Sequence, residues 1–138
     1  MRIAALVAAS LACVAVGVGA QTQKDDSTIR PGERRHEELG RTDLSVGRQA
    51  ITAVDHLGPT SATGWHTHPG EVVGYITEGT VVIEQRGKAT LTLQPGQSFV
   101  IPAGVAHNSR NNDGTSARMF VTFIVEKDKP LSTAAAVR

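Results

Sequence analysis

Two histidines separated by a single residue, His66 and His68, are the strongest chemical signal in the chain. On an extended strand, side chains alternate with a period of two, so both imidazoles would point to the same side. Imidazole is the commonest metal-ligand side chain, and two of them aimed at one point predict half of a metal site. Such a pair is often structural, so the prediction depends on finding further ligands elsewhere.

A third candidate ligand, His107, lies within a stretch of regularly placed glycine, proline and polar residues. In order, this stretch reads Gly96, five residues, Pro102, one residue, Gly104, two residues, His107, three residues and Asn111. It matches the second motif of the cupin family at each of its five positions. The stretch from Trp65 to Gly79 resembles the first cupin motif, and the 16 residues between the two fit small bacterial cupins.

The resemblance is to small single-domain cupins of the quercetinase-like, secreted bacterial type. It implies a cupin double-stranded β-helix, a jelly-roll barrel in which the two motifs lie on neighbouring strands. His107 would then converge with His66 and His68 around one divalent transition metal, leaving coordination positions open to water or substrate. Iron, manganese, zinc and nickel all accept three imidazoles, and the sequence does not choose among them.

One position departs from the family pattern. Counting back from Gly79, the usual glutamate of the first motif is replaced by Val72, and Glu71 stands one residue early. A one-residue offset on a regular strand points a side chain to the opposite face, although a bulge after Pro69 and Gly70 would return Glu71 to the interior. Glu71 is therefore a weak fourth candidate. Without it, the site resembles the three-histidine iron sites of some cupin dioxygenases more than the manganese site of germin-type oxalate enzymes.

The remaining histidines are not expected to bind the metal. His36 stands among charged residues that predict a solvated face, and His56 closes a strand, where it is expected to be structural or to line the rim. Four aromatic residues are candidate cavity walls or core residues: Trp65, Tyr75, Phe99 and Phe120.

The elements that must position these residues are short strands separated by turns rich in glycine, proline and asparagine, and this pattern predicts an all-β fold. Residues 34–39 could form a short helix or an edge strand, and the tail from Lys127 is expected to fray. Strands are expected at 48–57, 65–68, 72–77, 80–85, 89–93, 98–101, 105–108 and 118–126. Because the last of these is apolar on both faces, a second layer or a second copy of the chain should cover it, which favours a homodimer.

The first 20 residues predict a cleaved secretory signal peptide, with Arg2 before an apolar run and small residues up to Ala20. A flexible lead (21–33), the cupin domain (34–127) and a C-terminal tail (128–138) would follow. Cleavage would remove the only cysteine and leave a periplasmic or secreted protein without stable membrane insertion. The mature chain would carry 13 basic and 13 acidic residues, a balance that argues against nucleic acid as a partner.

Two functions remain open at this level. The first is a metal-dependent dioxygenase acting on a small oxygenated organic substrate. The second is a non-catalytic module that binds a small molecule and whose metal is structural or captures the ligand. A metal-free activity of the sugar-nucleotide epimerase kind would need a His–Asp couple and basic substrate contacts, and neither is apparent in the sequence.

Overall fold

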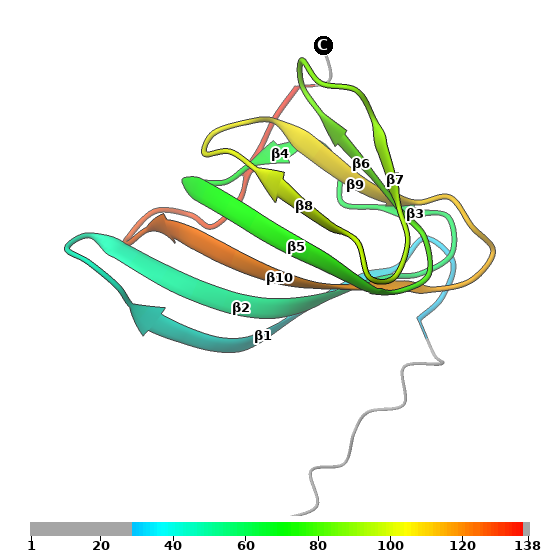
Figure 1. Ribbon diagram of the computed structural model, residues 1–138, viewed down its shortest axis with the longest axis horizontal. Coiled ribbons are helices and arrows are strands. Elements are labelled where there is room, and N and C mark those ends of the chain that lie inside the picture. Colours follow the sequence, from blue (N-terminus) through cyan, green and yellow to red (C-terminus); the bar gives the residue numbers. More distant parts are fainter. Residues whose placement is uncertain (1–28, 137–138) are drawn as a thin grey trace, which may run out of the picture.

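The computed structural model describes residues 29–136, and these residues form two antiparallel β-sheets that face each other (Figure 1). The five-stranded sheet has the order β1 (Arg34–Asp43), β2 (Arg48–Leu57), β10 (Ala117–Glu126), β5 (Gly70–Glu78) and β8 (Ser98–Ile101). The six-stranded sheet has the order β11 (Thr133–Ala134), β4 (His66–Thr67), β9 (His107–Asn111), β6 (Val81–Gln85) and β7 (Leu91–Leu93), and β3 (Ser61–Ala62) also pairs with β9.

The expected all-β fold is confirmed over the described residues, where every regular element is a strand. Within residues 29–136, no helix is long and apolar enough to cross a membrane. The predicted signal peptide and most of the predicted lead lie outside the described residues. Of that lead, residues 32 and 33 are held in place, because Gly32 donates to the carbonyl of Pro59 and Glu33 accepts from Gly58.

The hydrophobic core fills the space between the sheets, and it follows from the period-two alternation of the longer strands. In β10 and β2, alternate side chains are buried while their neighbours are partly or fully exposed. The inward-facing residues form one cluster of buried side chains: Ile51, Ala53, Leu57, Val72, Ile76, Val81, Ile83, Leu93, Phe99, Ile101, Ala117, Met119, Val121, Phe123 and Val125.

Several predicted strands shift in the structure. The segment from residue 34 forms a ten-residue edge strand, β1, which settles the choice between helix and strand. Strand β9 begins at His107 and continues to Asn111, two residues later at its start than expected, because Val105 closes the preceding turn by donating its amide to the carbonyl of Pro102. The expectation of a frayed tail is wrong for the described part, since Thr133 and Ala134 pair with β4.

The inner face of strand β10 is apolar and buried, whereas its outer face mixes apolar and polar residues and is not covered within the described chain. Its outward residues Phe120 and Ile124 lie on the open face of the five-stranded sheet, beside Tyr75 and Val73 of β5. Phe120 is 36% exposed and Tyr75 is 47% exposed. This face therefore exposes several large apolar side chains of β5 and β10.

Gly70, at the start of β5, tests how closely the backbones of β5 and β10 pack. A Cβ atom added to Gly70 would lie 2.1 Å from the carbonyl oxygen of Ile124, which is fixed backbone. We expect Gly70→Ala to lower the free energy of unfolding by about 2–3 kcal/mol, since the crowded backbone must move. Urea denaturation measures the change.

The matched control is Gly114→Ala, because a Cβ at Gly114 meets no atom within 4 Å. Its effect should stay within about 0.5 kcal/mol. If both variants lose the same free energy of unfolding, the close approach of the Ile124 backbone is not the reason for glycine at position 70.

Candidate metal centre

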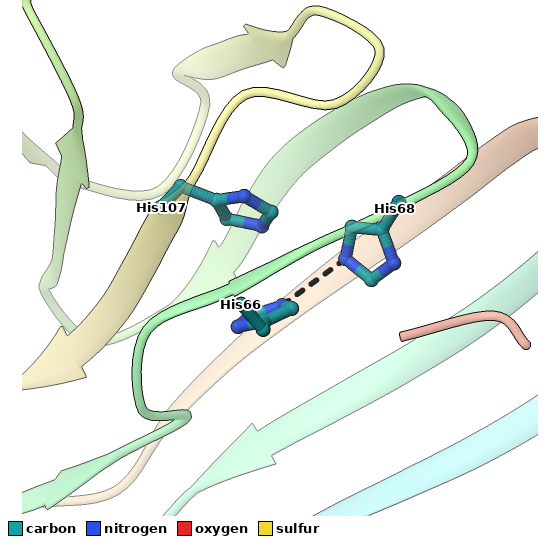
Figure 2. A group of neighbouring side chains, drawn as sticks. All are labelled: His66, His68 and His107. Carbon is teal, nitrogen blue, oxygen red and sulfur yellow. Dashed lines mark hydrogen bonds between the residues drawn. The ribbon is translucent and has the colours of Figure 1, made fainter. Parts of the chain in front are cut away.

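Three histidines from two neighbouring strand regions meet at one end of the space between the sheets (Figure 2). His66 begins β4 and is the direct partner of His107, the first residue of β9. His68 lies two residues beyond His66, so its imidazole comes to the same side. The ring centroids lie 4.3 Å apart for His66 and His107, 4.8 Å for His66 and His68, and 5.1 Å for His68 and His107.

Each imidazole is oriented by a backbone carbonyl. The Nδ1 atom of His66 lies 2.7 Å from the oxygen of Gly64, that of His68 lies 2.5 Å from the oxygen of Leu131, and that of His107 lies 3.0 Å from the oxygen of Val105. A carbonyl oxygen can only accept, so each Nδ1 carries the proton. The tautomer is thereby fixed, and all three Nε2 atoms keep a lone pair available as a ligand.

The donor set fits a divalent cation. The Nε2 atoms of His66 and His68 are 3.1 Å apart, and the possible ligand atoms of the three histidines all lie within 4.8 Å of one another. With both Nδ1 protons already committed, neither Nε2 can donate to the other, and a cation is what satisfies facing lone pairs. Burial lowers the pKa of His68 and of His107 to about 4, so both are neutral ligands at pH 7.

The structure does not bring Glu71 to the histidines. Strand β5 pairs with β10 in regular register here: Val72 opposes Phe123 in the interior, and Glu71 opposes Ile124 on the outer face. The Glu71 carboxylate accepts from Arg48 at 2.5 Å. A hydrogen bond from its own backbone and then this bond from Arg48 lower the pKa of Glu71. The alternative of a bulge that turns Glu71 inward is not what the chain adopts, so Val72 takes the inward position.

A cavity of about 180 Å³ opens onto the three histidines. Its walls are mostly apolar and come from both sheets, and the residues that line it besides the histidines of the centre are Arg34, His36, Asp55, Thr63, Val72, Phe99, Ser109, Met119, Val121, Phe123, Leu131 and Ser132. Of the four aromatic candidates, Phe99 lines this cavity. Trp65 does not, and Tyr75 and Phe120 lie on the outer face.

A His–Asp couple, not apparent from the sequence, lines the same cavity. His36 of β1 opposes Asp55 of β2, and its Nδ1 lies 2.5 Å from the Asp55 Oδ1. Neither residue belongs to the three-histidine group. His56 also stays apart: its side chain is buried near Arg35 and Glu37, and this burial lowers its pKa.

The C-terminal tail completes the centre. Besides the Leu131 carbonyl that orients His68, the Ala135 amide donates to Trp65, and Arg86 donates to the carbonyl of Ala136 at 2.6 Å. Leu131 also packs against the core and lines the cavity. Its place could not be read from the sequence because the tail has no strong strand pattern.

Comparison with known proteins agrees with this architecture. The family model described as "Cupin domain" matches residues 53–123, which is half of the chain. The protein belongs to the cupin family. No curated protein resembles the chain closely enough to count as a match.

Several solved structures share the fold. The polyketide cyclase RemF from Streptomyces resistomycificus is 24% identical, with a TM-score of 0.62 over 79% of this chain and 77% of that one. The protein TT1209 from Thermus thermophilus is 27% identical, with a TM-score of 0.58 over 70% and 87%. The DMSP lyase DddQ from Ruegeria pomeroyi DSS-3 is 20% identical, with a TM-score of 0.58 over 62% of this chain and 43% of that one. The chain therefore spans less than half of the lyase, and the likeness shows the fold.

The geometry predicts which of the candidate residues are needed for metal binding. His107→Ala should lower the affinity for zinc by more than about a hundredfold, because it removes a nitrogen that would bind the metal. Changing a residue that only hydrogen-bonds to a metal ligand has a smaller effect. Glu71→Ala should leave the affinity nearly unchanged, since its carboxylate is held by Arg48 on the outer face. Calorimetric titration of the metal-free protein with zinc measures both, and loss of binding in Glu71→Ala would contradict the outward placement.

Proposed function

We propose that the protein is a metal-dependent dioxygenase that acts on a small oxygenated organic substrate. The observation that carries the proposal is the group of three Nε2 atoms, each freed by a carbonyl-bound Nδ1 and all facing one small cavity. A bound iron, manganese, zinc or nickel ion would supply Lewis acidity and open coordination positions for oxygen donors.

Residues of the cavity would bind the substrate, and the histidines would set the charge of the metal centre. Phe99, Phe123 and Leu131 provide apolar walls that exclude water and hold the body of a small substrate. The three neutral imidazoles add no negative charge of their own, and no carboxylate joins them among the described residues. A neutral ligand set leaves the full charge of the cation available to polarise an oxygen donor.

The comparisons support a small-molecule site without choosing the reaction. An oxalate oxidase in complex with the substrate analogue glycolate shares the fold at 22% identity, with a TM-score of 0.59 over 79% of this chain and 57% of that one. Cyclase, lyase and oxidase structures on one fold mean that the reaction must be argued from the site. The alternative, a binding module whose metal captures a ligand, differs from the dioxygenase only in turnover.

Oxygen consumption separates these two functions. The protein loaded in turn with iron, manganese, zinc and nickel should consume oxygen with at least one phenolic or diketone substrate and one redox-active metal. His68→Ala should abolish this uptake together with metal binding, as measured by elemental analysis. Bound metal without oxygen uptake across the panel would contradict the dioxygenase and leave the binding module.

We also propose that the protein acts in the periplasm or outside the cell. The support is the sequence of residues 1–20, with its apolar run and small residues before Gln21.

We also propose that the protein forms a homodimer through the open face of its five-stranded sheet. The open face of the five-stranded sheet presents Val73, Tyr75, Val100 and Phe120, which are 43%, 47%, 55% and 36% exposed. Phe120 opposes Tyr75, and Val73 opposes Val100, so the four side chains form one continuous patch. A twofold axis would place this patch against itself, as dimer interfaces commonly do.

Val73→Lys should convert the dimer to a monomer, because it places a charge in the middle of the patch. The control is Val46→Lys, since Val46 is fully exposed in the turn between β1 and β2, away from the patch. Light scattering after size exclusion measures the solution mass. A monomeric wild-type protein would contradict the dimer, and the N-terminal segment would then be the cover to examine.

A further inference from the structure

The couple formed by His36 and Asp55 lies on the opposite sheet from the three histidines but lines the same cavity. The ring of Phe123 lies between the couple and the metal centre. Its centroid is 5.9 Å from that of His36 and 4.8 Å from that of His68. One small molecule in a cavity of about 180 Å³ can therefore touch the metal centre and the couple at once.

The couple is held ready for proton transfer. The Asp55 carboxylate can only accept, so the His36 Nδ1 carries the proton of their 2.5 Å contact, and in the neutral form of the imidazole Nε2 keeps a lone pair. Within residues 29–136, no hydrogen-bond partner occupies that Nε2. The His36 side chain is 38% exposed and that of Asp55 is 18% exposed, so the pair sits at the mouth of the cavity.

Within residues 29–136, the cavity lining offers no second side chain outside the metal centre that is suited to take up a proton. Among the described residues that line the cavity, the ionisable side chains outside the metal centre are Arg34, His36 and Asp55. Arg34 is a permanent cation, and Asp55 is committed to His36. The inward position on β5 closest to the centre is Val72, which has no base to offer.

We propose that His36, oriented by Asp55, takes the proton from an acidic hydroxyl of the substrate, an enol or a phenol, as that oxygen binds at the metal centre. This inference rests on the proposed function and adds its acid–base group and its substrate class. The O–H bond breaks, its electron pair stays on the oxygen, and the proton moves to the His36 Nε2. The resulting imidazolium is balanced by Asp55, and the substrate oxygen becomes an anionic donor.

The charges that face His36 are consistent with this role. The hydrogen bond that His36 donates to Asp55 raises the pKa of His36 above 6.5, with further support from Glu38, while burial and Arg34 oppose the rise. His68, across Phe123, is neutral at pH 7 because its own pKa is about 4. The raised pKa makes His36 a stronger base than a free histidine side chain. Its neutral form, which can accept a proton, accumulates as the pH rises above the pKa of His36.

The test uses protein loaded with zinc, which takes no part in oxidation, and 4-nitrocatechol, a phenol whose visible spectrum reports ionisation. The pH at which the bound probe is half ionised is measured from about pH 5 to about pH 9. We expect His36→Gln to raise this pH by about one unit, equal to a tenfold change in the ionisation constant. Asp55→Asn should shift it in the same direction, because His36 loses the carboxylate that stabilises its imidazolium.

The matched control is Glu37→Gln. It also removes a carboxylate from the β1–β2 ladder, but Glu37 opposes Val54 on the outer face. The half-ionisation pH of its bound probe should equal that of the wild type. Thermal melting reports whether each variant is folded, and Asp55→Asn carries the test alone if His36→Gln does not fold.

The outcomes separate this inference from the function on which it rests. Zinc and probe binding with an unchanged half-ionisation pH in His36→Gln and Asp55→Asn would overturn the couple and leave the metal centre intact. Zinc-loaded protein that does not bind the probe would also overturn it. If the wild type binds none of the four metals, the proposed function fails. In that case, or if it binds another of the metals but not zinc, the same titration on metal-free protein decides the couple: a shift that depends on His36 supports it, and the absence of a shift overturns it.

Discussion

The site depends on three hydrogen bonds from imidazole Nδ1 atoms to backbone carbonyls. The carbonyls belong to Gly64, Val105 and Leu131, which lie in three different loops of the chain. Each of these bonds fixes both the tautomer and the direction of its ring. The facing Nε2 atoms follow from this arrangement, and the surrounding barrel serves to hold the three loops at one place.

The second constraint is the alternation of side chains along β5 and β10. It puts Val72 and Phe123 inside and Glu71 and Ile124 outside, with Arg48 holding the Glu71 carboxylate on the surface. The regular register decides the ligand set, because a strand without a bulge cannot present Glu71 and Val72 to the same side. The absence of a carboxylate beside the histidines is thus a property of the strand as much as of the substituted residue.

The parts of the molecule that the sequence predicts are those with local signals. The spacing from Gly96 to Asn111 identifies the third histidine. Period-two alternation gives β2, and a short apolar run between turns gives β8, both at their observed bounds. The parts that it does not predict depend on which strands pair. His36 meets Asp55 only because β1 lies against β2, and Leu131 meets His68 only because the tail adds β11 to β4. No spacing within either segment contains that information, since the partners lie 19 and 63 residues apart.

The cavity separates two tasks that a carboxylate at the metal centre would combine. A glutamate beside three histidines would neutralise part of the cation's charge and would also be the nearest proton acceptor. Here the histidines are neutral, and the carboxylate that reaches the cavity, Asp55, is paired with His36 on the facing sheet. A proton taken up by His36 therefore leaves the ligand set unchanged. The apolar ring of Phe123 lies against both groups and keeps the intervening space poorly solvated, which strengthens the attraction between a substrate oxyanion and the imidazolium that its proton creates.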